Sequence, residues 1–327
     1  MQMIVMKHVT IVIVHWNKKD QLDICLSSLQ KTIYDNFSVV VVDNGSTDGS
    51  ATMVKQKYPS VDILENTENL GFAKGNNIGI KHAITKYNPD FVLLLNNDIE
   101  IIDGNWLNIF VDVASKKSVG IATCKLLNPD RSIQYSGSIL TVFGWKQYTS
   151  DGFTVDTSTD FAIGACFLIK REVIDKIGLL DEEFTPFLWE ETDYCTRAKK
   201  AGYTIIYTPR TNMVHYGSIS LGDLLKNNEN YDYIRFYISQ KNRLRYILLN
   251  WPFYKIFVSH LHQRYFPFWH MFFERKDTSK GYSLHNITFT HNMGRKIRYF
   301  LMAYWINIKN LNEIWYKRNH RTEKLMF

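Results

Sequence analysis

The sequence predicts an α/β protein with a mostly parallel sheet flanked by helices and a mainly helical C-terminal extension. Four short runs rich in apolar and β-branched residues, at 9–14, 37–43, 61–64 and 91–95, are typical of strands. A segment with helical features separates each run from the next, and this βαβαβαβ order favours an open parallel sheet with right-handed crossovers. The chain has 327 residues, of which 45% are apolar, which is ample for a buried core.

The predicted elements follow in order along the chain. Leu22, Cys25, Leu26 and Leu29 recur at helical spacing after the first strand, and Ser50 begins a second helix that stops at Pro59. A Gly- and Asn-rich loop at 69–80 opens a third helix that runs to about Tyr87. Beyond residue 98 we expect helices at 106–115, 171–177 and 189–201, strands at 120–127, 161–169 and 203–207, and a polar, turn-rich excursion over the sheet at 128–160.

Asn96, Asn97 and Asp98 follow the fourth strand, whose five consecutive apolar residues indicate burial on both faces. Ligands of open parallel sheets bind outside the carboxyl ends of the strands. A carboxylate beside two amides suits a divalent cation that carries phosphate oxygens, although the same pattern fits a polar turn.

Two further segments are each open to a ligand-binding interpretation and a structural one. Asp43 ends the second strand, where its carboxylate is able to bind a base or a ribose or to cap a turn before Asn-Gly. In the 69–80 loop, Gly71 permits a close backbone approach to a nucleotide, with Lys74 near its phosphates. Asn69 and Asn76 are ligand groups or turn residues, and the loop is not the GxGxxG of a dinucleotide site.

Glu190, Glu191 and Asp193 cluster after Trp189 at the start of a predicted helix. Acidic residues favour a helix N-terminus for dipole reasons alone. Crowded carboxylates also repel one another, which is one way to poise a general base. His215, after the last predicted strand, is either a metal ligand or structural.

Taken in order, these segments resemble glycosyltransferase family 2, the inverting sugar-nucleotide enzymes with the GT-A fold. The likeness is strongest to the bacterial rhamnosyltransferase-like and galactofuranosyltransferase-like members, and it spans about residues 8–220. The matching segments are 43–50, 69–77, 96–98 in place of the metal-binding DxD, 164–171, 189–193 and His215.

The resemblance implies a role for each matching residue. The residues implied to bind the nucleotide-sugar donor are His15, Asn17, Asp43, Asn69, Gly71, Lys74, Asn76 and Asn97. Asp98 and His215, with Asn96 beside them, are implied to bind a Mg²⁺ or Mn²⁺ cofactor. Glu191 is the implied catalytic base that deprotonates the acceptor hydroxyl, and the acceptor or sugar is oriented by Gly164, Ala165, Trp189, Glu190 and Asp193.

The sequence departs from the family pattern at two places. Asn96 stands where the first Asp of DxD is expected, so metal ligation rests on Asp98 and His215. The family's Glu-Asp pair is here Glu190-Glu191, which lengthens the implied base by one methylene.

Charge divides the chain into a predicted catalytic domain, 1–225, and a C-terminal region, 226–327. The C-terminal region carries 18 Lys and Arg against 6 Asp and Glu, whereas the catalytic domain carries 21 against 26. A predicted helix at 231–249 interleaves basic and aromatic residues, and Trp269, Phe272, Trp305 and Trp315 continue the pattern. Such helices bind anionic membrane surfaces, although the same residues also suit packing on the catalytic domain or in a homodimer. No nucleic-acid recognition motif accompanies them.

Four separated cysteines without a CxxC pair argue against a disulfide framework or a zinc site, and no apolar run reaches the ~20 residues of a membrane helix. The N-terminus shows no signal peptide pattern. We therefore expect a cytoplasmic enzyme, peripheral on the inner face of the bacterial plasma membrane, that transfers a sugar from a dTDP- or UDP-linked donor to a polysaccharide or lipid-linked glycan acceptor. Rhamnose is favoured and a UDP-hexose or UDP-galactofuranose donor is the alternative. A further alternative is a non-catalytic partner of this fold in a polysaccharide assembly complex.

Overall fold

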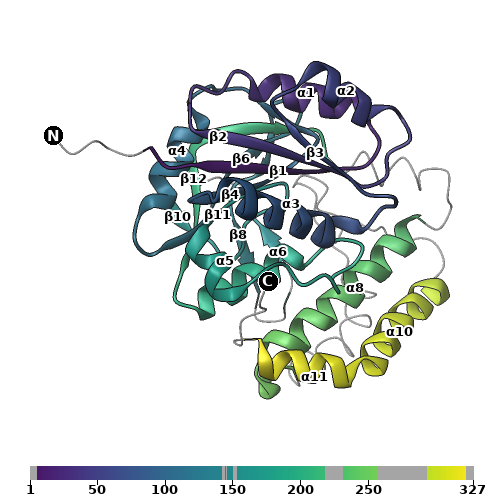
Figure 1. The fold of residues 1–327 in the computed structure, drawn as a ribbon. Coiled ribbons are helices and arrows are strands. Elements are labelled where there is room, and N and C mark those ends of the chain that lie inside the picture. Colours follow the sequence, from purple (N-terminus) through teal and green to yellow (C-terminus); the bar gives the residue numbers. More distant parts are fainter. Residues whose placement is uncertain are drawn as a thin grey trace.

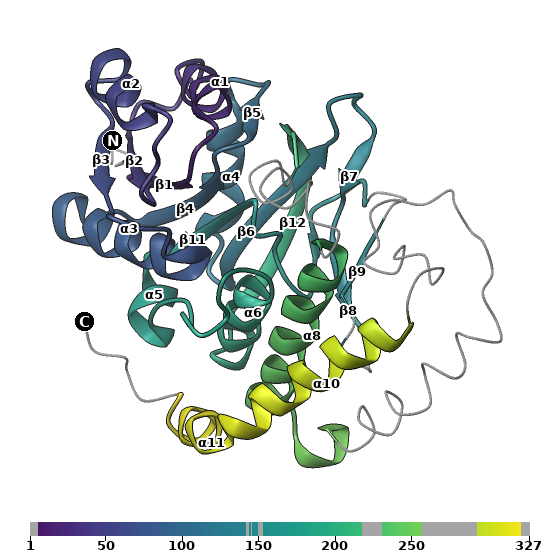
Figure 2. The ribbon, with the colours of Figure 1, turned by 90° about the vertical axis from the view of Figure 1, so that its right-hand side faces the viewer.

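A central mixed sheet with helices on both faces forms the body of the molecule, and the C-terminal helices lie against one side of it (Figures 1 and 2). This computed structural model describes residues 6–141, 144, 146–149, 153–217, 231–256 and 293–321. The strands are β1 (Val9–His15), β2 (Phe37–Asp43), β3 (Asp62–Glu65), β4 (Phe91–Asn96), β5 (Ile99–Ile101), β6 (Val119–Leu127), β7 (Ile133–Tyr135), β8 (Ser138–Leu140), β9 (Lys146–Tyr148), β10 (Thr157–Ser158), β11 (Cys166–Lys170) and β12 (Thr204–His215). The helices are α1 (Lys19–Leu29), α2 (Ser50–Lys57), α3 (Gly71–Tyr87), α4 (Trp106–Ser115), α5 (Arg171–Ile177), α6 (Glu190–Lys200), α8 (Tyr231–Asn250), α10 (Met293–Lys309) and α11 (Leu311–His320).

The predicted parallel order is confirmed for the first four long strands. The sheet runs β10-β12-β6-β11-β4-β1-β2-β3, and β1 pairs in parallel with both β2 and β4. The second half departs from that pattern, because β11 is antiparallel to β4 and to β6. The carboxyl ends of β1, β2 and β4 therefore meet at one edge of the sheet, where ligands of α/β folds bind.

Two apolar cores cover the two faces of the sheet. Alternate residues of β1 point to opposite faces, so Ile11 and Ile13 pack with α1 and α4, whereas Val12 packs with α3, α5 and α6. This burial on both faces explains why the strands show continuous apolar runs.

The Gly- and Asn-rich segment predicted as a loop is largely helical, because α3 already begins at Gly71. A Cβ at Gly79 would lie 2.3 Å from Cγ1 of Val12, and one at Gly75 would lie 2.9 Å from Cγ1 of Val14. The absent side chains thus let α3 pack closely on β1, which outweighs the low helix propensity of glycine.

Other boundaries also differ from the sequence predictions. The strand expected at 161–169 is confined to β11, and a short strand that was not predicted, β5, follows Asp98. The strand expected at 203–207 continues as β12 to His215, with an irregular register between Thr208 and Asn212. The 128–160 excursion supplies β7, which pairs with β6, the β8–β9 hairpin, and β10, which pairs with β12.

The C-terminal helix expected at 231–249 matches α8, and α8 packs on the predicted catalytic domain. Tyr246, Ile247 and Trp251 form an apolar cluster with Phe184 and Trp189, to which α11 adds Ile314. Packing on the catalytic domain, one of the alternatives for the aromatic residues, is therefore correct for this part of the C-terminal region. Trp269 and Phe272 lie outside the described residues. Within the described helices, none has the length and apolar character needed to cross a membrane.

Candidate active site

The end of β12 brings His215 to the end of β4. Asn97 and Asp98 form the turn between β4 and β5, and β5 pairs antiparallel with β12 so that Ile99 lies opposite His215. Two residues 117 positions apart in the sequence therefore meet at the edge where β1 and β2 also end.

Asp98 and His215 present two adjacent, unsatisfied ligand atoms. Oδ1 of Asp98 lies 3.2 Å from Nε2 of His215, both residues are largely buried, and neither atom has a hydrogen-bond partner in the described part of the chain. Two ligands 2.0–2.1 Å from one Mg²⁺ and at right angles to each other are about 3 Å apart. The pair therefore fits a divalent cation. A bound cation would give both buried atoms the polar partner that they lose when they leave water.

Gln134 of β7, which sequence analysis missed, fixes the tautomer of His215. Its amide nitrogen donates to the backbone oxygen of His215 over 3.1 Å, so its Oε1 faces Nδ1 of the same histidine and accepts the proton there. Nε2 is then the nitrogen with the free lone pair, as required of a metal ligand. Among the described residues no cluster of three metal-ligating side chains occurs, so Asp98 and His215 are a two-residue candidate site. Divalent cations in nucleotide sites commonly take their other ligands from phosphate oxygens and water.

His15 and Asn97 link β1 to the same turn. Nδ2 of Asn97 donates to Nδ1 of His15 over 2.8 Å, and burial lowers the pKa of His15 to about 4. His15 is therefore neutral at pH 7, and the proton on its Nε2 has no hydrogen-bond partner in the described structure. The backbone nitrogen of Asn96 donates to the oxygen of Ala165 over 2.9 Å, which ties β4 to the segment before β11.

Asp43 is buried and organises the loop after β2. Its Oδ1 accepts hydrogen bonds from the backbone nitrogen, at 3.0 Å, and the hydroxyl of Ser46. Ser46 in turn accepts from the backbone of Asn17 over 2.8 Å, and the side chain of Asn17 accepts from Thr47 over 3.0 Å. The capping role left open by the sequence is thus present, while Oδ2 of Asp43 makes no hydrogen bond to a described residue.

The predicted donor residues around α3 are joined to the end of β2, because Nδ2 of Asn44 donates to Oδ1 of Asn69 over 3.4 Å and to the oxygen of Gly71 over 3.2 Å. Asn69 accepts a hydrogen bond from the nitrogen of Gly71 over 2.9 Å, and Asn76 donates to the oxygen of Phe72 over 2.9 Å. Both side chains therefore stabilise the start of α3, while Lys74 is exposed. Gly71 has φ +80°, and a Cβ there would lie 2.9 Å from the oxygen of Pro186.

The acidic residues at the start of α6 separate into two environments. Glu190 and Glu191 are both buried, and a Cβ at Gly164 would lie 3.8 Å from Cγ of Glu191. Because Gly164 precedes the Ala165 that binds Asn96, this segment connects the base candidate to the strand end that precedes Asp98.

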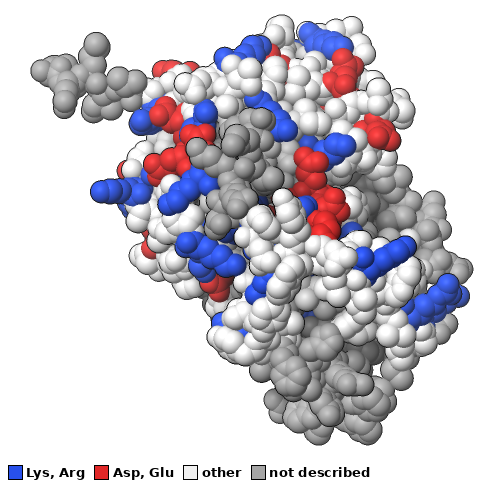
Figure 3. Space-filling view, turned by 60° about the horizontal axis from the view of Figure 1, so that its bottom comes forward, with Lys and Arg blue, Asp and Glu red and all other residues white. Residues whose placement is uncertain are grey.

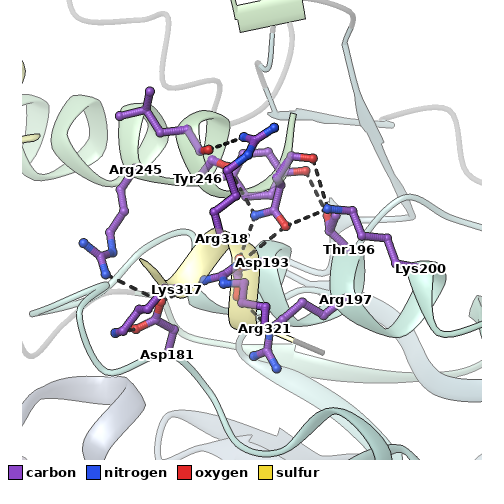
Figure 4. Close-up of polar contacts among 12 residues, drawn as sticks. Asp181, Asp193, Thr196, Arg197, Lys200, Arg245, Tyr246, Lys317, Arg318 and Arg321 are labelled. Atoms are coloured by element: carbon purple, nitrogen blue, oxygen red, sulfur yellow. Dashed lines mark hydrogen bonds and ion pairs between the residues drawn. The ribbon is translucent and has the colours of Figure 1, made fainter. Parts of the chain in front are cut away.

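Asp193, three residues after Glu190 on α6, has a different set of partners. Its carboxylate is fully buried and is bound by Arg197, Arg321 and Asn250 (Figure 4). Trp189 is also buried, with its ring 5.2 Å from that of Tyr246. Asp193 and Trp189 therefore both contact the C-terminal region, and Trp189 also faces Lys146, whose ammonium lies 4.7 Å from its ring centre.

Lys146 of β9 is a second residue that sequence analysis missed. Its buried ammonium forms an ion pair with Oε1 of Glu191. The two residues are 45 positions apart and Lys146 lies in the turn-rich excursion, so no sequence spacing connects them.

The sequence was compared with protein families and with individual known proteins. The sequence model described as glycosyl transferase family 2 matches residues 10–178. The protein y4gI of Sinorhizobium fredii is 28% identical over 211 residues, and the O-antigen biosynthesis protein RfbC of Myxococcus xanthus is 26% identical over 227 residues. These matches cover 60% and 65% of this chain but only 23% and 17% of those longer proteins. The N-acetylglucosaminyl-diphospho-decaprenol L-rhamnosyltransferase of Mycobacterium tuberculosis is 26% identical over 238 residues, which are 65% of this chain and 77% of that protein.

Two solved structures share the fold. GalNAc-T7, solved with UDP, GalNAc and Mn²⁺, aligns with a TM-score of 0.61 at 17% identity over 80% of this chain and 51% of its own. The mannosyltransferase PcManGT of Pyrobaculum calidifontis, solved with GDP-Man and Mn²⁺, aligns with a TM-score of 0.54 at 15% identity over 97% of this chain and 85% of its own. Both likenesses confirm the predicted GT-A fold.

Proposed function

The chain belongs to glycosyl transferase family 2, and we propose that it is an inverting, metal-dependent transferase that moves a sugar, with rhamnose favoured, from a nucleoside-diphosphate donor to a hydroxyl of a cell-surface polysaccharide or lipid-linked glycan precursor. The observation that carries this proposal is the pair of buried, unsatisfied ligand atoms on Asp98 and His215. Residues 164–165 connect the end of β4, which precedes Asp98 in the chain, to Glu191.

The strand edge provides the donor site. Oδ2 of Asp43 accepts a hydrogen bond from the base or the ribose, and Asn17 and Ser46 hold the loop around it. Asp98 and His215 would hold Mg²⁺ or Mn²⁺, with Asn96 beside them. When bound, the cation offsets the negative charge that develops on the departing nucleoside diphosphate.

Glu191 provides the base. Oε1 is bound by Lys146 and, over 3.2 Å, by the hydroxyl of Thr192, whereas Oε2 makes no hydrogen bond to a described residue. Oε2 is therefore able to take the proton of the acceptor hydroxyl as that oxygen attacks the anomeric carbon from the face opposite the diphosphate. One such displacement inverts the anomeric configuration.

The name of the mycobacterial relative supports rhamnose as the transferred sugar and a lipid-linked acceptor. A dTDP-linked donor is our first choice, and a UDP-hexose or UDP-galactofuranose donor is the alternative. A non-catalytic member of an assembly complex would not need the Asp98–His215 pair or an oriented Glu191, and both favour an enzyme.

Replacing Asp98 by Asn should weaken donor binding in the presence of Mn²⁺ by about tenfold or more, because the site loses its only described carboxylate ligand. Isothermal titration with dTDP-rhamnose and UDP-sugars, with and without Mn²⁺, measures the effect. Asp103→Asn, which changes a carboxylate in the loop after β5, is the matched control and should bind as the native chain does. Donor binding that ignores both Mn²⁺ and Asp98, together with absence of donor turnover, would contradict the enzyme proposal and favour the non-catalytic alternative.

We further propose that the enzyme docks on the inner face of the plasma membrane through α10. Ile297, Leu301, Trp305 and Ile308 recur at helical spacing on that helix, and each is more than half exposed. The helix carries four Lys and Arg residues and no Asp or Glu. In Figure 3, which brings the C-terminal helices forward, the surface there is mostly uncharged with separate basic side chains. A basic, apolar helix of this kind suits anionic lipid.

The double variant Leu301→Glu and Trp305→Glu should bind anionic vesicles at least about tenfold more weakly, because two apolar side chains no longer enter the lipid interface. Co-sedimentation with phosphatidylglycerol vesicles measures binding, and Ile33→Glu, on an exposed loop of the catalytic domain, is the control. Unchanged vesicle binding would refute docking through α10. A dimer that the double variant disrupts would assign the surface to a second copy of the chain instead.

A further inference from the structure

Lys146 is buried at the active site. It lies on β9, which pairs with β8, and only 3% of its side chain is exposed. Its ammonium contacts Glu191 and lies 4.7 Å from the ring centre of Trp189 and 5.3 Å from that of Phe161. Lysine is almost never fully buried without a partner, so this position depends on the negative charge of Glu191.

Glu190 and Glu191 are adjacent carboxyl groups that share this one cation. Burial, reinforced by the charge of Glu191, raises the pKa of Glu190 to about 8, and Oε2 of Glu190 has no hydrogen-bond partner in the described structure. Burial also opposes the charged form of Lys146, but the surrounding acidic groups, with Glu191 the strongest, together outweigh burial and raise the pKa of the ammonium. At neutral pH Glu190 therefore holds its proton beside the Lys146–Glu191 ion pair.

The two oxygens of Glu191 are not equivalent. Lys146 and Thr192 both bind Oε1, so the carboxylate has a fixed orientation, and Oε2 remains for the acceptor. We propose that Lys146 is a positioning residue that binds Oε1 of Glu191 and aims its free oxygen, Oε2, at the acceptor hydroxyl. Because the one cation is committed to Glu191, Glu190 retains its proton. This inference rests on the proposed role of Glu191 as the base.

Within the described part of the chain, other charged or titratable groups around the cluster come from β9, α6 and α8. They are Tyr148, Cys195, Lys199 and Arg235. Burial raises the pKa of both Tyr148 and Cys195, so these two groups are neutral at pH 7. Lys146 is thus the cation in direct contact with the base among the described residues.

The proton balance of the step is simple. The acceptor hydroxyl gives its proton to Oε2 of Glu191 as the new bond between its oxygen and the anomeric carbon forms. The bond between that carbon and the diphosphate oxygen breaks, and its electron pair leaves with the nucleoside diphosphate. Lys146 keeps its proton throughout and acts through Glu191 only.

The test compares the pH dependence of transfer in Lys146→Met, Lys146→Gln and Lys146→Arg. Without the cation, two buried carboxyl groups lack a counter-charge, so the acid limb of kcat/KM should move up by at least about one pH unit in the Met and Gln variants. Transfer at pH 7 should fall at least about tenfold and partly recover at higher pH, while Lys146→Arg should restore the native profile in part. Lys199→Met, an exposed lysine of α6 paired with Asp160, is the control. A native pH profile in the Met and Gln variants would overturn the proposal.

A second measurement needs neither turnover nor a stable Lys146 variant. Infrared titration of the native chain against Glu190→Gln should show one protonated carboxyl at pH 7, assigned to Glu190, that titrates near pH 8. If Glu190 is ionised at pH 7, the proposal is wrong. If the infrared titration shows a protonated Glu190 but the protein transfers no sugar, the proposed function is wrong. The Lys146–Glu191–Glu190 arrangement would still be supported in that case.

Discussion

Replacing Glu191 by Gln is expected to lower sugar transfer at pH 7 by at least about 10²-fold, because an amide cannot accept the proton of the acceptor hydroxyl. Donor binding should be unchanged, since the described hydrogen bonds of Glu191 reach only Lys146 and Thr192 and not the donor edge at Asp43 and Asp98. Initial rates of nucleoside diphosphate release measure the first effect. Isothermal titration with donor and Mn²⁺ measures the second.

Glu172→Gln is the matched control for this substitution. Glu172 lies at the start of α5 with its side chain 53% exposed, so the same chemical change there should leave transfer unaltered. Near-normal transfer by Glu191→Gln would contradict the assignment and move the role of the base to Glu190. Asp193 is the weaker substitute, because Arg197 and Arg321 enclose its carboxylate.

The sequence predicts the sheet and its ligand-binding edge because both follow from local patterns. Buried parallel strands require apolar runs, and polar residues at their carboxyl ends must share one edge. Asp43 and Asp98 come together for this reason. The approach of His215 depends instead on β5, a three-residue strand too short to give a periodic signal, and was implied only by the family resemblance.

The residues that orient the candidate catalytic groups were not predictable in the same way. Gln134 and Lys146 lie in the excursion at 128–160, whose turn-rich composition carries no periodicity. Their partners, His215 and Glu191, are 81 and 45 positions away. Such contacts arise from tertiary packing, and a single polar residue in a short strand does not reveal its partner.

The charge asymmetry between the two parts of the chain has a structural explanation that the sequence left open. Asp181 is buried among Arg245, Lys317 and Arg321, and Arg321 also binds Asp193 of the base helix α6 (Figure 4). Part of the basic excess of the C-terminal region thus neutralises acidic groups of the catalytic domain. A further part of the basic excess lies on α10, the helix of the proposed membrane contact.

Replacing Asp181 by Asn is expected to destabilise the chain by about 3–5 kcal/mol, because it leaves buried cations without their counter-charge. Thermal unfolding should show a lower midpoint, and hydrogen exchange should be faster in α11, which reaches Asp181 through Lys317. Asp175→Asn is the control. That aspartate is 48% exposed and paired with Arg171 on the same helix, so its loss should cost less than about 1 kcal/mol.

The pH dependence provides an independent check on Asp181. Burial opposes its ionisation, but the charges of Arg245, Lys317 and Arg321 outweigh burial and hold the pKa of this carboxyl well below its usual range. Because the pKa is lower in the folded than in the unfolded chain, the carboxylate adds stability that is complete above the unfolded pKa of about 3.9 and is lost as the pH falls through the folded pKa. The difference in unfolding free energy between the native chain and Asp181→Asn should therefore be constant above about pH 5 and shrink below about pH 4. A difference that stays constant down to pH 3 would show that the asparagine acts by altering packing rather than charge. In that case the C-terminal helices would be held on the catalytic domain by the apolar cluster around Trp189 and Tyr246 instead.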